Sequence, residues 1–277
     1  MTDIAASSID WHVAWQGDPK LPVLALVHGF AGSLHTWDYL RVDLEQHFHL
    51  MLIDLPGHGR TPLPAESDFT LVRLGEALGQ LISNAADGPA RLCGYSMGGR
   101  IALHTALFAP ETVKSLALIG TSAGIGDPKE REERRKSDRE LAANIREKGI
   151  EWFADYWHNL PLFSTLKSLP PPIREHLYEA RLANVPESLA YTLEHFGVGT
   201  QEDLHSRLFE LQCPLLLIAG ALDHKFCRLN QIAEQDARAS ALPVKRAEIH
   251  GAGHAAHIEA PDLVAQELID FLKPVHL

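Results

Sequence analysis

The chain has 277 residues, a formal net charge of -11 and an isoelectric point near 5.8. This acidic balance argues against nucleic acid or an anionic membrane surface as a partner, because neither attracts a negatively charged protein. An anionic substrate would have to meet locally placed arginines, and the length suits one α/β domain with an insertion.

The first residues and the cysteines indicate where the protein works. Residues 1–10 lack a basic segment followed by an apolar one, and no run approaches about 18 apolar residues, so we expect neither a signal peptide nor membrane insertion. Cys93, Cys213 and Cys227 are odd in number and lack C-x-x-C spacing, which favours neither disulfides nor a zinc site. We expect a cytoplasmic protein that is a monomer or a small homo-oligomer.

Short β-rich runs alternate with helical patterns along the chain. This alternation predicts an α/β fold with a doubly wound, mainly parallel sheet. The predicted strands are residues 11–15, 23–28, 50–54, 91–95, 116–120, 215–219 and 245–249, and an amphipathic helix at 261–272 closes the chain.

The first strand-to-loop junctions carry recognisable sequences. The run 23–27 leads into His28-Gly29-Phe30, and the run 50–54 leads into Asp-Leu-Pro-Gly-His-Gly-Arg at 54–60. The Gly and Pro of the second loop are most simply turn formers.

The sequence Gly94-Tyr95-Ser96-Met97-Gly98 stands between the apolar run 90–93 and the helix-like stretch 100–108. Small residues two places on either side of a serine permit the strained strand-to-helix turn called a nucleophile elbow, which is typical of α/β-hydrolase folds. In such folds the residue after the nucleophile and the loop after an earlier strand supply the N–H groups of an oxyanion hole. Ser96 is therefore a candidate catalytic residue, with Met97 and Phe30 as oxyanion donors.

The alternation of strand-like and helical patterns stops after Thr121. Residues 122–212 show only helical patterns, charge runs and a proline cluster at 170–172, so we predict an inserted helical lid there and a core made of residues 1–121 and 213–277. Residues 127–140 hold six acidic and six basic side chains at spacings of three and four, which is typical of a solvated helix. The pattern also allows one or two arginines of this helix to point inward, toward the rest of the protein.

Two later strands lead to a carboxylate and an imidazole. Asp223 follows the strand at 214–219, and His254 follows the strand at 245–249. The order Ser, Asp, His is that of the α/β-hydrolase sheet, whose chemistry lies at the carboxyl ends of the strands. A serine hydroxyl reacts poorly at neutral pH, so His254 would take its proton and Asp223 would orient the imidazole.

These residues also have simpler interpretations. Asp223 alone could be a helix cap, and Cys93 is most simply a small buried core residue. His250, His254 and His257 resemble a metal cluster only superficially, since glycines separate them and neither an H-E-x-x-H pattern nor a carboxylate partner is present. We expect no metal and no cofactor.

Arg100, in the first turn of the helix after Ser96, narrows the substrate class. A guanidinium is of no use to a neutral ester, but it binds a carboxylate in bidentate fashion.

Over most of its length the chain resembles the 2-succinyl-6-hydroxy-2,4-cyclohexadiene-1-carboxylate synthases of menaquinone and phylloquinone biosynthesis, the MenH type. The lid motifs are the diagnostic part, because generic hydrolases share the elbow and the histidine. The matching segments are Gly94 to Arg100, residues 131–139, Trp157 with Pro161-Leu162-Phe163, Arg181-Leu182-Ala183-Asn184 with Pro186, Asp223-His224-Lys225-Phe226 and Ala252-Gly253-His254. The chain departs from the family at His158, where another aromatic residue is expected, and in a longer span from Phe163 to Arg181.

The resemblance implies a lyase that acts on a small polycarboxylate. The family's substrate is a cyclohexene with a ring carboxylate, a succinyl arm and an enolpyruvyl ether, and the reaction eliminates pyruvate without consuming water. Arg134 is preferred over Arg135, from which about 100° of helical rotation separates it. The implied site comprises Ser96, Asp223 and His254 as catalytic residues, Phe30 and Met97 as the oxyanion hole, and Tyr95, Arg100, Arg134, Trp157 and Arg181 as substrate contacts.

Two other functions are weighed against the synthase. The first is a hydrolase that cleaves an ester or a carbon-carbon bond of a small carboxylated substrate with the same serine. The second is a binding protein on a catalytically retired scaffold, which the presence of all three triad members disfavours.

Overall fold

The computed structural model describes residues 9–63, 70–238 and 242–273. Its strands form a seven-stranded sheet in the order β1-β3-β2-β4-β5-β6-β7, in which β1 pairs with β3 antiparallel and every other pairing is parallel. The strands are β1 (Val13–Gln16), β2 (Val23–Val27), β3 (His49–Ile53), β4 (Ala90–Tyr95), β5 (Val113–Ile119), β6 (Leu215–Gly220) and β7 (Val244–Ile249).

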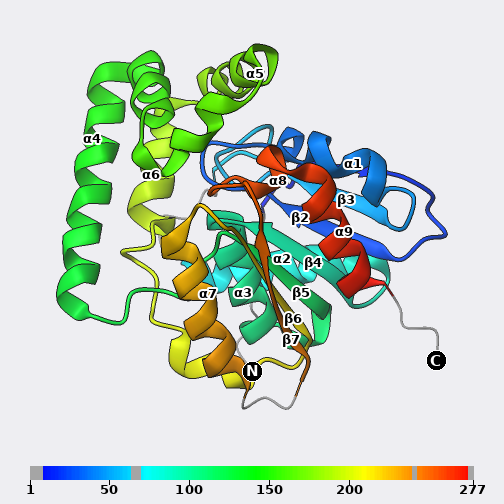
Figure 1. The fold of residues 1–277 in the computed structure, drawn as a ribbon. Helices are drawn as coiled ribbons and strands as arrows, with labels where there is room; N and C mark the ends of the chain where they lie inside the picture. The colour runs from blue at the N-terminus through cyan, green and yellow to red at the C-terminus, as the bar shows by residue number, and fades with distance from the viewer. Residues whose placement is uncertain (1–8, 64–69, 239–241, 274–277) are drawn as a thin grey trace.

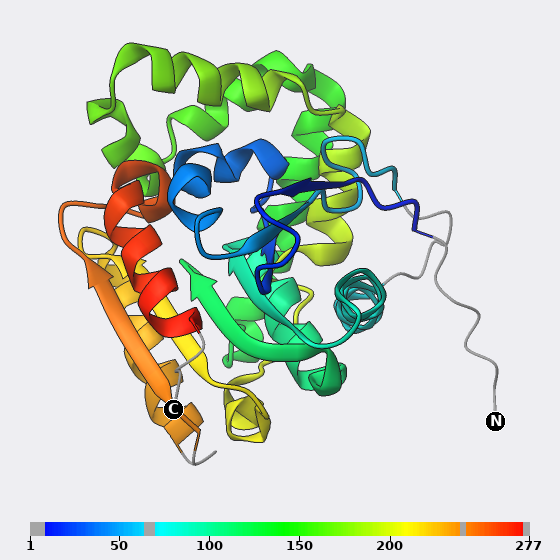
Figure 2. The same cartoon turned by 90° about the vertical axis from the view of Figure 1, so that its right-hand side faces the viewer.

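Helices cover both faces of this sheet (Figures 1 and 2). The central strands β4 and β6 are buried along their whole length, as expected where a parallel sheet is covered on both sides. Ala25 and Val27 pack with α2 (Leu71–Ala86), α3 (Met97–Phe108) and α7 (His224–Ala237), whereas Leu24 and Leu26 pack with α1 (Asp38–Leu44), α8 (Ala256–Glu259) and α9 (Pro261–Leu272). The short helices η1 (Leu34–Trp37) and η2 (Pro110–Thr112) complete this part.

The fold class and all seven strands agree with the prediction, with shifted ends. The largest shift is at β5, which begins at Val113 rather than at residue 116. Lys114 and Ser115 interrupt the apolar pattern there, so the sequence signal starts only after them, although Arg91 of β4 pairs with Ser115. Polar residues at a strand end do not prevent ladder pairing, because the backbone supplies the hydrogen bonds.

The chain between β5 and β6 is helical, as predicted for residues 122–212. It holds α4 (Pro128–His158), η3 (Pro161–Ser168), α5 (Pro171–Leu182), α6 (Pro186–Phe196) and η4 (His205–Glu210). Figure 2 shows α4, α5 and α6 above the arrowheads of the parallel strands, where chemistry is expected. The division of the chain into a core and a lid stays a prediction.

The helix α4 is highly charged, and one carboxylate of its charged run is buried rather than exposed to solvent. Most side chains of residues 127–140 are exposed, whereas Asp138 is buried. Gly149, with φ of 80°, breaks the helical geometry inside α4. Within the described residues, no helix combines the length and apolar composition that crossing a membrane would require.

Two glycines of α2 let this helix lie close to α3. A Cβ atom added at Gly75 would meet the Cβ atom of His104 at 2.8 Å and its carbonyl carbon at 2.9 Å. A Cβ atom at Gly79, one turn later, would meet that of Ala109 at 2.8 Å. The close approach positions α3, which begins at the candidate catalytic serine.

We therefore expect Gly75→Ala to destabilise the protein, although alanine favours helices over glycine by about 1 kcal/mol. Overpacking against a backbone atom typically costs about 1–3 kcal/mol, so the free energy of unfolding should fall. Asn84→Ala, at an exposed position of the same helix, is the control and should leave that free energy unchanged or slightly raised. Urea unfolding followed by circular dichroism measures both; equal stability of the two variants would contradict the packing argument.

Candidate active site

Ser96 lies at the junction of β4 and α3 with a backbone that non-glycine residues avoid. Its φ is 52° and its ψ is -109°. The turn is tight enough that a Cβ atom at Gly94 would meet the Gly98 carbonyl oxygen at 2.5 Å, and one at Gly98 would meet the His28 carbonyl oxygen at 2.2 Å. The predicted elbow is thus present, and its glycines are required by close backbone contacts.

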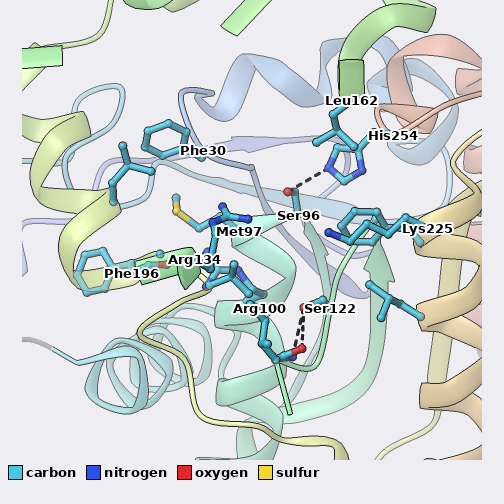
Figure 3. Close-up of a pocket in the computed structure, with 18 of the residues that line it drawn as sticks. Phe30, Ser96, Met97, Arg100, Ser122, Arg134, Leu162, Phe196, Lys225 and His254 are labelled. Carbon is cyan, nitrogen blue, oxygen red and sulfur yellow. Dashed lines mark hydrogen bonds between the residues drawn. The ribbon is translucent and has the colours of Figure 1, made fainter. Parts of the chain in front are cut away.

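The three predicted catalytic side chains are hydrogen-bonded in series, and Figure 3 shows the contact between Ser96 and His254. His254 Nε2 lies 3.3 Å from Ser96 Oγ, and His254 Nδ1 lies 2.8 Å from Asp223 Oδ2. A carboxylate at Nδ1 requires a proton on that nitrogen, which leaves Nε2 free to accept the serine proton. The order of the contacts is that of a Ser–His–Asp triad.

Asp223 serves two structural purposes at once. Its Oδ2 contacts His254, while its Oδ1 accepts a hydrogen bond of 3.3 Å from the Phe226 N–H and caps α7. The helix cap considered as a rival interpretation is therefore present together with the imidazole contact.

Aromatic rings and one glycine enclose His254, which is 3% exposed. The rings of Phe226, Tyr95 and Phe163 lie 4.6, 5.5 and 5.8 Å from the imidazole centre. Gly120 at the end of β5 has φ of 55°, and a Cβ atom there would lie 3.0 Å from His254 Cε1. The imidazole is therefore held in one orientation by packing as well as by Asp223.

The predicted oxyanion donors lie on the same cavity wall as the serine. Phe30 and Met97 both line it (Figure 3), and neither backbone N–H finds an acceptor within residues 9–63, 70–238 and 242–273. Met97 opens α3, where the first N–H groups have no intrahelical partner. Two such donors suit an oxygen that gains negative charge.

A buried network that the sequence did not reveal fixes the loop of Phe30. Asp54 accepts hydrogen bonds from Leu34 N–H at 2.8 Å and Arg60 N–H at 2.9 Å. Burial raises the pKa of Asp54, but these bonds and His12 outweigh it and lower the pKa overall. His28 accepts from the Leu55 N–H at 3.0 Å, which joins the two loops. The loop at 54–60 is thus an anchor as well as a turn.

A cavity of about 410 Å³ opens above these groups, and its charged lining is mainly basic. Among the residues that the structure describes, the cations of the lining are Arg100, Arg134 and Lys225, and its one acidic residue is Glu130. The buried Arg100 donates to the Phe196 carbonyl oxygen at 2.7 Å and to Gln201 Oε1 at 3.3 Å. Burial, and then Arg134, lower the pKa of Arg100 to about 10, so its guanidinium stays charged at neutral pH.

The structure distinguishes Arg134 from Arg135. Arg134 lines the cavity and donates to Asp138 Oδ1 at 2.8 Å. Arg135 instead donates to the Gly199 carbonyl oxygen and to Glu132. The geometry favours Arg134 as the residue that could reach a ligand.

Two predicted substrate contacts lie in a second cavity of about 80 Å³ next to the first. Tyr95 and Arg181 line only this smaller cavity, whereas Trp157, Phe30 and Phe163 line both. The guanidinium of Arg181 lies 6.0 Å from the centre of the Phe163 ring and 3.3 Å from His158 Nδ1. Arg181 and Tyr95 thus line the smaller cavity, which shares three aromatic side chains with the cavity of Ser96.

The histidines after β7 do not gather around a common point. His250 is exposed, whereas His257 is buried between the rings of Trp37 and Tyr95 at 5.3 and 4.1 Å. The residues that the structure describes contain no group of three or more His, Cys, Asp or Glu side chains placed to hold a metal ion.

Comparison with known proteins agrees with this geometry. The family described as "alpha/beta hydrolase fold" matches residues 22–261. The sheet, the elbow and the Ser–His–Asp series accordingly define a protein of the α/β-hydrolase fold.

More specific relatives match almost the whole chain. A Bacillus subtilis (strain 168) protein, provisionally named 2-succinyl-6-hydroxy-2,4-cyclohexadiene-1-carboxylate synthase, is 36% identical over 272 residues, 98% of this chain and 97% of the relative. The synthase of that name from Citrobacter koseri is 32% identical and covers 93% of this chain and 96% of its own. The solved structure of MenH from S. aureus superposes with a TM-score of 0.89 at 30% identity, covering 94% and 97% of the two chains. The chain belongs to the 2-succinyl-6-hydroxy-2,4-cyclohexadiene-1-carboxylate synthase family.

Because the backbone at Ser96 is strained, this residue should lower the free energy of unfolding. Residues in sparsely populated backbone regions cost about 1–3 kcal/mol, and glycine removes this cost while losing about 0.5–1 kcal/mol of chain entropy. We expect Ser96→Gly to raise the free energy of unfolding by about 1 kcal/mol relative to Ser96→Ala, since both lack the hydroxyl and only alanine keeps the Cβ atom. Urea titrations measure the difference, and equal midpoints for the two variants would argue against strain.

His257 should make the fold sensitive to acid. Burial, with a smaller contribution from His254, lowers the pKa of His257 from 6.5 to about 3. The folded chain keeps it neutral while the unfolded chain protonates it, so its stabilisation is complete above pH 6.5 and is lost as the pH falls from 6.5 toward 3. On going from pH 7 to pH 5, the free energy of unfolding of the wild type should fall further than that of His257→Phe, by about 2 kcal/mol.

The exposed His250 supplies the control for this measurement. His250→Phe should keep the acid sensitivity of the wild type in urea titrations at the two pH values. If His257→Phe showed the same loss as His250→Phe, the buried imidazole would not be the source.

Proposed function

We propose that this protein is a carbon-oxygen lyase that eliminates pyruvate from 2-succinyl-5-enolpyruvyl-6-hydroxy-3-cyclohexene-1-carboxylate. The product is 2-succinyl-6-hydroxy-2,4-cyclohexadiene-1-carboxylate, the compound named in the synthases that the chain resembles over at least 93% of its length. The proposal sets the reaction in the cytoplasm, for which the free thiols of Cys93, Cys213 and Cys227 are suited. The partner is a small polycarboxylate.

The two structures of the ring define the step. The substrate has its double bond at C3 and the product has double bonds at C2 and C4, so the proton leaves C2 and the enolpyruvyl oxygen leaves C5. C2 carries the succinyl carbonyl, which accepts the electron pair of the broken C–H bond as negative charge on its oxygen. That pair then forms the C2–C3 double bond, the ring double bond moves to C4–C5, and the C5–O bond breaks. The departing enolpyruvate takes up a proton and becomes pyruvate.

In this proposal Ser96 removes the C2 proton. His254 accepts the serine proton through Nε2, 3.3 Å from the hydroxyl, and Asp223 stabilises the imidazolium through Nδ1. The N–H groups of Phe30 and Met97 bind the succinyl carbonyl oxygen while it carries charge. No acyl-enzyme forms and no water is consumed, and the proton on His254 is available for the departing enolate.

The observation that carries the proposal is the placement of cations around Ser96. In a protein of net charge -11, Arg100, Arg134 and Lys225 line the same cavity as the serine and the imidazole. Burying a guanidinium costs free energy that a substrate carboxylate can offset. A neutral ester would leave this cost uncompensated.

A hydrolytic function is the second candidate, and the intact triad favours it. The same serine, imidazole and oxyanion donors would form and cleave an acyl-enzyme if a carbonyl carbon, rather than an acidic C–H bond, lay over Ser96. Such an enzyme would hydrolyse p-nitrophenyl esters at substantial rates.

Ser96→Ala should reduce pyruvate release from the enolpyruvyl substrate by several powers of ten, since removing one triad member costs about 10⁴-fold or more. Lactate dehydrogenase and NADH report pyruvate continuously. Ser83→Ala, in the last turn of α2 and before the amino end of β4, is the matched control and should behave as the wild type.

Two results would contradict the proposal in different ways. Near-normal pyruvate release by Ser96→Ala would remove the serine from the mechanism. A wild-type preparation that releases no pyruvate but rapidly hydrolyses p-nitrophenyl acetate would support the hydrolase instead.

A further inference from the structure

The cations of the cavity lie on two sides of the candidate catalytic serine. Arg100 and Arg134 come from α3 and α4, whereas Lys225 comes from the first turn of α7. In Figure 3, Lys225 reaches toward the pocket on the side of Ser96 opposite to Arg134. A ligand with anionic groups at both ends could therefore place its central part over the serine.

Lys225 differs from the two arginines in what it contacts. Arg100 donates to Phe196 and Gln201, and Arg134 donates to Asp138. Among the described residues, the Lys225 ammonium has neither a hydrogen-bond acceptor nor an ion-pair partner, and it lies 5.7 Å from the centre of the Phe226 ring.

The neighbouring carboxylate does not neutralise this charge. Asp223, two residues earlier, uses one oxygen for His254 and the other for the Phe226 N–H. Lys225 is exposed, so an ammonium that faces only solvent is the simple alternative. Its position in the cavity wall, beside the imidazole, instead makes it available to a bound anion.

We infer that Lys225 binds the carboxylate of the leaving enolpyruvyl group, while Arg100 and Arg134 hold carboxylates of the part that stays on the ring. This inference rests on the proposed function. An ammonium is a compact, strongly hydrated charge on a flexible stem, so it can hold an anion at the exposed side and return it to water. A planar guanidinium binds a carboxylate in bidentate fashion and therefore more rigidly, which suits the ring that must stay positioned over Ser96; of the two arginines, Arg100 is also buried.

The position of Lys225 also serves the bond that breaks. As the C5–O bond breaks, negative charge moves onto the enolpyruvyl oxygen, next to the carboxylate that Lys225 binds. A positive charge at this point stabilises the departing enolate more than it stabilises the neutral ether. Removal of the charge should therefore affect the reaction as well as the binding of pyruvate.

The test compares Lys225→Met and Lys225→Arg with Lys114→Met. Lys114 is also exposed but lies near the amino end of β5, so it supplies the same loss of charge away from the cavity. Lys225→Met should lower kcat/KM for the enolpyruvyl substrate about tenfold and raise the product-inhibition constant of pyruvate about tenfold, as expected for one charge-assisted hydrogen bond. Lys225→Arg should restore most of kcat/KM and most of the affinity for pyruvate. Lys114→Met should match the wild type in both measurements.

A second inhibitor identifies which carboxylate is bound. The aromatic analogue 2-succinylbenzoate carries the ring carboxylate and the succinyl arm but no enolpyruvyl group, so Lys225→Met should leave its inhibition constant unchanged. Circular dichroism and thermal unfolding verify that the variants are folded.

Four outcomes overturn the inference. Unchanged pyruvate inhibition in Lys225→Met shows that this ammonium does not bind the leaving group, and equal weakening of 2-succinylbenzoate assigns it to the retained part. If the wild type turns over and Lys225→Met behaves as Lys114→Met, only the role of Lys225 fails. If the wild type releases no pyruvate, the proposed function fails and the inference falls with it.

Discussion

The close approach of β2, β4 and α3 at Ser96 is the constraint on which the site depends. The Gly98 Cα lies so near the end of β2 that an added Cβ atom would be 2.2 Å from the His28 carbonyl oxygen. This contact places Met97, at the start of α3, beside Phe30, which follows β2 by three residues. The strain at Ser96 and the pairing of the two N–H donors thus have one origin, and neither can be relaxed without moving the other.

Electrostatics adds a second layer to this geometry. Arg100 is buried, and both of its protein acceptors are neutral, namely the Phe196 carbonyl and the Gln201 amide. Asp138, the buried carboxylate nearby, is shared with Arg134. The protein therefore carries the cost of desolvating guanidinium charge before any ligand binds. Such preorganisation favours an anion over a neutral molecule, even though the chain as a whole is acidic.

Much of this arrangement follows from local sequence patterns, and the rest depends on packing over long distances. Strands, elbow, Asp223 and His254 are predictable because apolar runs and chain order place them at one edge of a parallel sheet. The environment of Arg181 cannot be predicted from local sequence, because it depends on how α5 packs against Phe163 and His158. The Asp54 network was also missed, because its partners lie up to 42 residues away and show no local pattern.

One catalytic apparatus can serve both hydrolysis and elimination because both reactions gather charge on a carbonyl oxygen. In hydrolysis the charge follows attack of the serine on the carbonyl carbon, whereas in the proposed elimination it follows loss of a proton from the adjacent carbon. The oxyanion donors meet the same atom in each case. What separates the reactions is which atom lies over the Ser96 hydroxyl, and this is decided by groups that hold the substrate at a distance from it. In the proposed reaction those groups are the cations of α3, α4 and α7 that line the cavity, so residues that take no part in proton transfer would decide the chemistry of the serine.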